Sequence, residues 1–216
     1  MQPAVIHPVR GTPRRRRRAL VVLGALVVAA AAAAGAARLQ PGWFHSQPAA
    51  GDAQLETARA LEQFVASELT HVRGKGAQAW RMRVRAEDVN AWLAARLPQW
   101  LEHDRSLPWP QDVGTPQARV DGQAFELAAP WKGWVVSSRW SIQPAGAGAV
   151  AATLEPDGGA VGCLPIPLGT QVGAWFVPEL GKALLLKAAL GDGRTVRVTG
   201  AEFEDSAVVL DLVTDG

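Results

Sequence analysis

The chain has 216 residues, a formal net charge of +2, nine tryptophans, no tyrosine and one cysteine. Six of its 22 basic residues lie in the first 18 positions, which contain no acid, so the remainder carries 16 basic against 20 acidic residues. This distribution argues against nucleic-acid binding, which needs clustered Lys and Arg on the folded part. One cysteine excludes an intramolecular disulfide framework, and the four histidines lack metal-ligand spacing, so we expect no metal and no other cofactor.

Residues 19–37 form one unbroken apolar run that directly follows five arginines. At about 1.5 Å per residue, a helix of this length spans roughly 28 Å, close to the hydrocarbon thickness of a bilayer. Basic residues beside a span stay cytoplasmic. The pattern therefore predicts a cytoplasmic tail at 1–18, a transmembrane helix at 19–37 and an extracytoplasmic remainder in a single-pass membrane protein. The charges that set this topology are Arg14, Arg15, Arg16, Arg17 and Arg18, and the larger anchor residues are Leu20, Val21, Val22, Leu23, Leu26, Val27 and Val28.

A cleaved signal peptide is the competing interpretation of the same segment. Its basic n-region, apolar h-region and small residues at Ala34, Ala36 and Ala37 would fit a cleavage site, and the product would be a free exported protein. The run is longer than the usual h-region of about 7 to 15 residues, which favours the uncleaved anchor. Both interpretations export the same domain.

The next two segments are a linker and a helix. Residues 38–51 are rich in Pro, Gly and Ala and predict a linker, in which Trp43 and Phe44 are interpreted as an interfacial anchor on the outer membrane surface. Residues 52–70 place apolar residues at helical spacing and predict a helix with Asp52 as its N-cap.

A strand and a second helix are predicted next. Residues 79–85 alternate strictly between apolar residues and arginines, which predicts a half-buried strand. Its outer row is interpreted as a solvated face, with an anion site as the less favoured alternative. Residues 86–101 then predict a helix that Pro98 ends or kinks.

Strand patterns fill most of the rest. In chain order we predict a loop at 102–116, a strand region at 118–130 in which Asp121–Gly122 signals a hairpin or a bulge, and strands at 131–143 and 149–155. A turn at 156–159, a strand at 161–168, a helix at 171–190, and strands at 195–199 and 207–213 are predicted to follow. Segregated helices and strands predict the α+β class. We expect one extracytoplasmic domain at 52–216, with a mainly antiparallel sheet and about three helices.

The tryptophans are the candidate ligand-binding residues. Trp109 and Trp131 are flanked by loop residues and are free to line a surface, and Trp175 could line an apolar cavity with Trp131. The alternative is that the tryptophans fill the core of a chain without tyrosine. Cys163 is expected to be a small buried residue.

The only dense polar group is formed by Glu87, Asp88, Glu102, His103 and Asp104. His103 between two acids suggests a general base, and an envelope hydrolase would need such groups to converge in one cleft. An exposed junction between helix and loop is the favoured interpretation. We therefore name no catalytic residue and do not favour an enzyme.

Three segments resemble YpmS-like, DUF2140-type single-pass bacterial membrane proteins of unknown function. They are Arg85–Leu93 (RAEDVNAWL), Gly162–Pro167 (GCLPIP) and the closing strand pair Val196–Leu210. The resemblance implies a membrane-tethered exported domain related to curved-sheet lipid-binding modules, and it transfers no catalytic residue. From the residues themselves, we expect Asn90 to bond a neighbouring loop or strand end, and Pro165 and Pro167 to close a sheet edge.

Together these patterns predict a membrane-anchored envelope domain of binding or scaffold type. Its expected partners are the membrane and a lipid, a wall polymer or an envelope protein. The alternatives are an envelope hydrolase, or a secreted carrier if residues 1–37 are removed.

Overall fold

The computed structural model describes residues 13–46, 50–71, 78–103, 112–146, 148–166 and 184–215. The helices in this part of the chain are α1 (Pro13–Arg38), α2 (Asp52–Thr70), α3 (Ala86–Ala95) and α4 (Leu97–His103). The strands are β1 (Gln78–Arg85), β2 (Gln117–Asp121), β3 (Ala124–Trp131), β4 (Trp134–Gly146), β5 (Ala149–Val161), β6 (Leu164–Ile166), β7 (Leu184–Leu185), β8 (Lys187–Ala189), β9 (Thr195–Glu204) and β10 (Ala207–Asp215).

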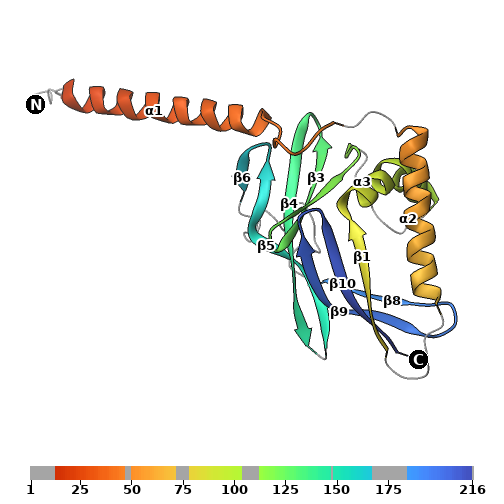
Figure 1. Ribbon diagram of the computed structural model, residues 1–216. Helices are drawn as coiled ribbons and strands as arrows, with labels where there is room; N and C mark the ends of the chain where they lie inside the picture. Colours follow the sequence, from red (N-terminus) through yellow and green to blue (C-terminus); the bar gives the residue numbers. More distant parts are fainter. Residues whose placement is uncertain are drawn as a thin grey trace, which may run out of the picture.

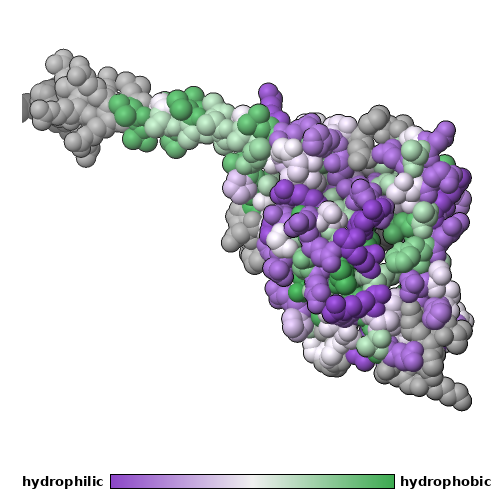
Figure 2. All heavy atoms as spheres, in the orientation of Figure 1, coloured by the Kyte–Doolittle hydropathy of each residue, from purple (hydrophilic) through white to green (hydrophobic). Residues whose placement is uncertain are grey.

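Helix α1 projects away from the rest of the chain (Figure 1). Its large aliphatic side chains between Val21 and Val28 are exposed, and Figure 2 shows the coloured part of the helix as an apolar rod. Over Val21–Arg38 it is long and apolar enough to cross a membrane, a property that a signal sequence shares.

The strands form two antiparallel sheets, which confirms the predicted α+β class. The four-stranded sheet has the order β1-β10-β9-β8, and the six-stranded sheet has the order β2-β3-β4-β5-β6 with β7 paired to β5. Three helices follow α1 within the described ranges.

The four-stranded sheet confirms the predicted strand at 79–85. Trp80, Met82 and Val84 lie on the inner face, opposite Leu212, Leu210 and Val208 of β10. Val65 and Leu69 of α2 pack on this face, where Val196, Val198 and Leu212 form the core with Val150 from the other sheet. The predicted helix at 52–70 is also confirmed, although Gly51 rather than Asp52 is its N-cap.

The predicted strand boundaries are wrong at three places in the six-stranded sheet. A turn at Lys132–Gly133 separates Trp131 in β3 from Trp134 in β4, and Gly133 has a φ of 83° that favours glycine. Another turn at Gly162–Cys163 separates β5 from β6. The predicted turn at 156–159 lies within strand β5 instead. The pairing of β5 with β4 shifts register there, between Ser138 and Trp140 of β4. At Gly158 an added Cβ would lie 2.8 Å from the Arg139 Cβ.

The other two predicted helices have different outcomes. The helix predicted at 86–101 is interrupted at Arg96, between α3 and α4, which confirms the predicted break near Pro98, a residue that fits the first turn of α4. The predicted helix at 171–190 is wrong over its described end, where β7 and β8 pair with β5 and β9. Long-range pairing therefore overrides the local helical pattern there.

The start of the predicted linker is docked on the six-stranded sheet. Phe44 is 3% exposed and packs between Ala128 and Val135, with Trp43 beside it. The His45 amide donates to Gln117 Oε1 at 3.2 Å, and Gln117 Nε2 donates back to the His45 carbonyl. Phe44 is therefore a core residue, and its interpretation as an interfacial anchor is wrong.

Candidate functional site

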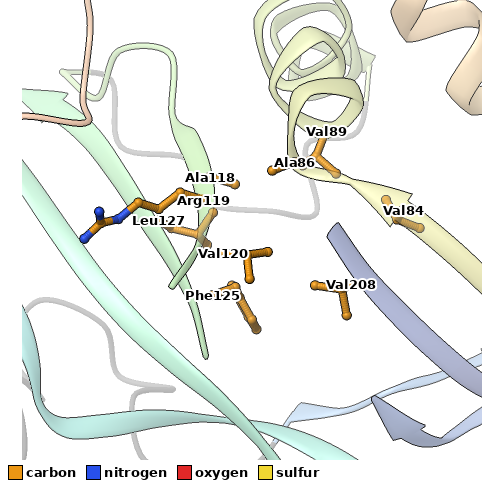
Figure 3. Close-up of a pocket in the computed structure, with 9 residues that line it drawn as sticks. All are labelled: Val84, Ala86, Val89, Ala118, Arg119, Val120, Phe125, Leu127 and Val208. Atoms are coloured by element: carbon orange, nitrogen blue, oxygen red, sulfur yellow. The ribbon is translucent and has the colours of Figure 1, made fainter. Parts of the chain in front are cut away.

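An apolar groove lies between the two sheets, where their edge strands β1 and β2 diverge beside α3 (Figure 3). We call it the intersheet groove. Its volume is about 190 Å³, and its lining residues are Val84, Ala86, Val89, Ala118, Arg119, Val120, Phe125, Leu127 and Val208.

Strand alternation explains why one wall is apolar. Ala118 pairs with Leu127, and Val120 pairs with Phe125, so these four side chains share one face of the six-stranded sheet. The next residues along β2 and β3 point to the opposite face. Figure 3 shows Val120 and Phe125 approaching Val84 and Val208 from the opposite wall.

Arg119 is the one charged lining residue, and its guanidinium leads out of the groove (Figure 3). It lies 4.8 Å from the centre of the Trp43 ring and 2.7 Å from the Glu126 carboxylate. The groove therefore offers an aliphatic and aromatic surface to a ligand, because the Arg119 guanidinium lies outside it.

Asn90 attaches α3, which contributes the end of the groove, to strand β2. Its side-chain amide donates to the Ala118 carbonyl at 2.8 Å, and its Oδ1 accepts from the Ala118 amide at 2.6 Å. Both backbone groups of an edge-strand residue are thereby satisfied by one side chain. The predicted role of Asn90 as a partner for a strand is confirmed.

The start of α3 is held by the other sheet. The Ala86 amide donates to the Ser206 carbonyl at 2.7 Å, and Arg85 pairs with Glu87 at 2.7 Å and Asp88 at 3.0 Å. Hydrogen bonding with Asp88 raises the pKa of Arg85 above its ordinary value. Helix α3 therefore bridges the two sheets and sets the width of the groove.

Of the three predicted ligand-binding tryptophans, Trp131 lies within the described residues, and it does not line this groove. Trp131 ends β3, forms a bridge with Val113 and lies under Lys132, whose ammonium is 5.5 Å from its ring centre. Trp109 and Trp175 fall outside the described residues.

The polar group considered for catalysis is dispersed among other contacts. Glu87 and Asp88 pair with Arg85, whereas His103 Nδ1 lies 2.7 Å from the Gln99 carbonyl at the end of α4. Asp104 falls outside the described residues. No cluster of three His, Cys, Asp or Glu suited to a metal occurs among the residues that the structure describes.

The outer arginines of β1 face acids on neighbouring strands. Arg81 pairs with Asp211 at 2.7 Å and Glu202 at 3.0 Å, and Arg83 pairs with Glu204 at 2.7 Å. The charge of Asp211, and then that of Glu202, raises the pKa of Arg81. These pairs support the predicted solvated face and disfavour the anion site.

Sequence reasoning missed a second ionic cluster, on the face of the six-stranded sheet away from the groove. Arg139 pairs with Asp121 and lies 3.0 Å from Glu155, while Arg119 pairs with Glu126. The hydrogen bond with Asp121 is the main cause of the raised pKa of Arg139. Basic and acidic residues alternate with apolar residues along β2 and β3, and this sequence pattern could have predicted the ion pairs.

Cys163 is also placed differently from expectation. It is exposed in the β5–β6 turn rather than buried, because its amide bonds the end of α1 while its side chain points outward. Its thiol lies 3.7 Å from the Gln40 carbonyl.

Comparison with known protein families, with curated proteins and with solved structures finds no match to this chain.

Proposed function

We propose that the protein is a membrane-anchored envelope domain that binds the apolar chain of a lipid in the intersheet groove. The carrying observation is an open groove of about 190 Å³ whose walls are aliphatic and aromatic. Engineered apolar cavities of about 150 Å³ bind benzene, so this groove has room for a ring or a short length of acyl chain. The resemblance to YpmS-like proteins of unknown function implies a relation to curved-sheet lipid-binding modules, which is consistent with this ligand class.

The anchor is α1, with Arg14–Arg18 cytoplasmic and the domain outside the cytoplasm. Retention of α1 is supported by its contacts: Ala37 is 7% exposed, and the Ala36 carbonyl accepts a hydrogen bond from Cys163. Cleavage after Ala37 would remove this docked turn from the sheet.

The mass of the mature protein from a bacterial host tests the anchor. We expect the intact N-terminus, pelleting with membranes after carbonate washing, and digestion by protease added to spheroplasts. A soluble species beginning near Arg38 would overturn the anchor and favour a secreted carrier that uses the same groove.

Groove occupancy is tested by native mass spectrometry of the full-length chain purified in mild detergent with added palmitic acid. Val120→Trp and Val208→Phe fill the groove from opposite walls, and Ala188→Trp adds a similar ring at an exposed position of β8. We expect both groove variants to retain severalfold less palmitate than the wild type and the β8 variant. Equal retention by all four proteins, each with a native thermal transition, would contradict the groove proposal.

A further inference from the structure

The end of α1 is built into the six-stranded sheet. The Cys163 amide donates to the Ala36 carbonyl at 2.9 Å, and an added Cβ at Gly162 would collide with the Ala37 carbonyl. The following residues then continue into the Phe44 cluster. The end of α1 and the segment that follows it are therefore both attached to the six-stranded sheet. This double attachment fixes which end of the sheet faces α1.

Two hairpin turns occupy that end of the sheet (Figure 1). One is Gly162–Cys163, which contacts α1 directly, and the other is Lys132–Gly133 between β3 and β4. Trp131 and Trp134 form a cross-strand pair that flanks the second turn. We call the second turn with its two tryptophans and Arg38 the exit face.

Each tryptophan of the exit face carries a basic partner. The Arg38 guanidinium lies 5.9 Å from the centre of the Trp134 ring, and the Lys132 ammonium lies 5.5 Å from the centre of the Trp131 ring. Cation–π contact holds each charge beside an amphipathic ring. Tryptophan is enriched at the level of lipid headgroups, and basic groups are attracted to anionic lipids.

The existing ion pairing leaves these charges available. Lys132 lies 3.4 Å from Asp112, but both side chains are about 60% exposed, and such a surface pair is worth little in water. Among the residues that the structure describes, Arg38 contacts the ring of Trp134. A lipid phosphate can therefore engage both cations without breaking a buried interaction.

We propose that the exit face is a second membrane contact, which rests on the headgroup layer and binds anionic phospholipid through Arg38 and Lys132. This inference rests on the proposed anchoring by α1. We identify the binding partner as lipid headgroups because the exit face adjoins the end of α1. A surface beside the end of a membrane-spanning helix contacts the headgroups of the leaflet at which the helix ends. The domain would then lie against the bilayer in one orientation rather than swinging on a tether.

Full-length protein reconstituted with phosphatidylcholine, alone or mixed with phosphatidylglycerol, tests the proposal. A trace of phosphatidylglycerol with a diazirine near its headgroup labels contacting residues, and fragment-ion sequencing locates the adducts. We expect adducts at Trp131–Trp134 in the mixed vesicles. Arg38→Gln and Lys132→Gln should each lower that yield by up to roughly fivefold, the effect of one basic group near an anionic surface.

Arg59→Gln is the matched control, because it removes an exposed arginine from α2, on the side of the domain away from α1. It should leave the yield at Trp131–Trp134 unchanged. Equal labelling of Trp131–Trp134 in the wild type and in both exit-face variants would overturn the proposal. A wild type in which this segment is not labelled would also overturn it. Adducts within residues 19–37 report the anchor separately, so an anchored chain with an unlabelled exit face contradicts this inference alone.

Discussion

The two sheets use the same alternation of apolar and polar residues to different ends. The four-stranded sheet buries its inner face under α2 and part of the other sheet, and its outer face is a ladder of Arg–acid pairs. The six-stranded sheet has one face covered by the segment around Phe44 and leaves part of the other open as the groove. The contrast teaches that a strand pattern fixes which face is apolar, whereas the covering elements decide whether that face becomes core or site.

The largest expected effect comes from uncovering the six-stranded sheet. Phe44→Ala should lower the free energy of unfolding by about 3–5 kcal/mol, the usual cost of deleting a buried phenylalanine. Chemical unfolding of the full-length chain in detergent measures it. Phe64→Ala on α2 makes the same change at a side chain that is 41% exposed, and it should cost much less. Equal costs would show that Phe44 is not part of the core of this sheet.

A smaller effect is expected where α3 holds the two sheets together. Asn90→Ala leaves the Ala118 amide and carbonyl without their side-chain partner and should cost about 1–3 kcal/mol. Asn90→Asp keeps an acceptor for the Ala118 amide but places a carboxylate oxygen against the Ala118 carbonyl, so it should also be less stable than the wild type. The same unfolding measurement compares the three proteins. Either variant with the stability of the wild type would contradict the assigned hydrogen bonds.

A third prediction concerns how stability depends on pH at the junction between α2 and α3. Glu62 accepts hydrogen bonds from Arg96 at 2.9 Å and Trp92 at 3.0 Å, and chiefly the Arg96 bond lowers its pKa below the ordinary value of 4.5. The folded state therefore favours the carboxylate, so this contribution to stability is complete above the ordinary pKa and is lost as the pH falls below it. As the pH is lowered through that range, the midpoint temperature of thermal unfolding should fall less steeply for Glu62→Gln than for the wild type. Parallel profiles would contradict the role of Glu62.

The smallest effect is expected on the outer face of the four-stranded sheet. Arg83→Gln removes an exposed pair with Glu204 and should change the free energy of unfolding by no more than about 1 kcal/mol. Added salt should reduce the difference from the wild type, since exposed charges are screened. A loss as large as that of Phe44→Ala would mean that the ion-pair ladder stabilises the sheet as strongly as its core does.

The regular parts of the fold could be predicted from local periodicity. The helical spacing at 52–70 and the alternation at Trp80–Val84 gave elements that the structure confirms within a residue or so at their ends. Asp121–Gly122 signalled a hairpin or a bulge from neighbouring residues alone, and the structure has a hairpin between β2 and β3 there.

The errors lie where distant segments decide the structure. Pro156–Gly159 reads as a turn, but it lies within β5, at the register shift between the pairs Ser138–Gly159 and Trp140–Leu154. The pattern around Leu184 reads as helix, but β5 draws that residue into a strand. The groove escaped prediction for the same reason, since Val84 and Val120 become opposite walls only after two sheets and α3 assemble.

The contact between Cys163 and the exit of α1 also constrains the order of biogenesis. Cys163 and Gln40 are 123 residues apart, so α1 emerges from the ribosome long before the turn that receives it. During that interval, the exit segment has no sheet to dock against, and Phe44 lacks its pocket between Ala128 and Val135. Completion of the chain through β6 is therefore the step that allows the end of α1 to dock on the six-stranded sheet.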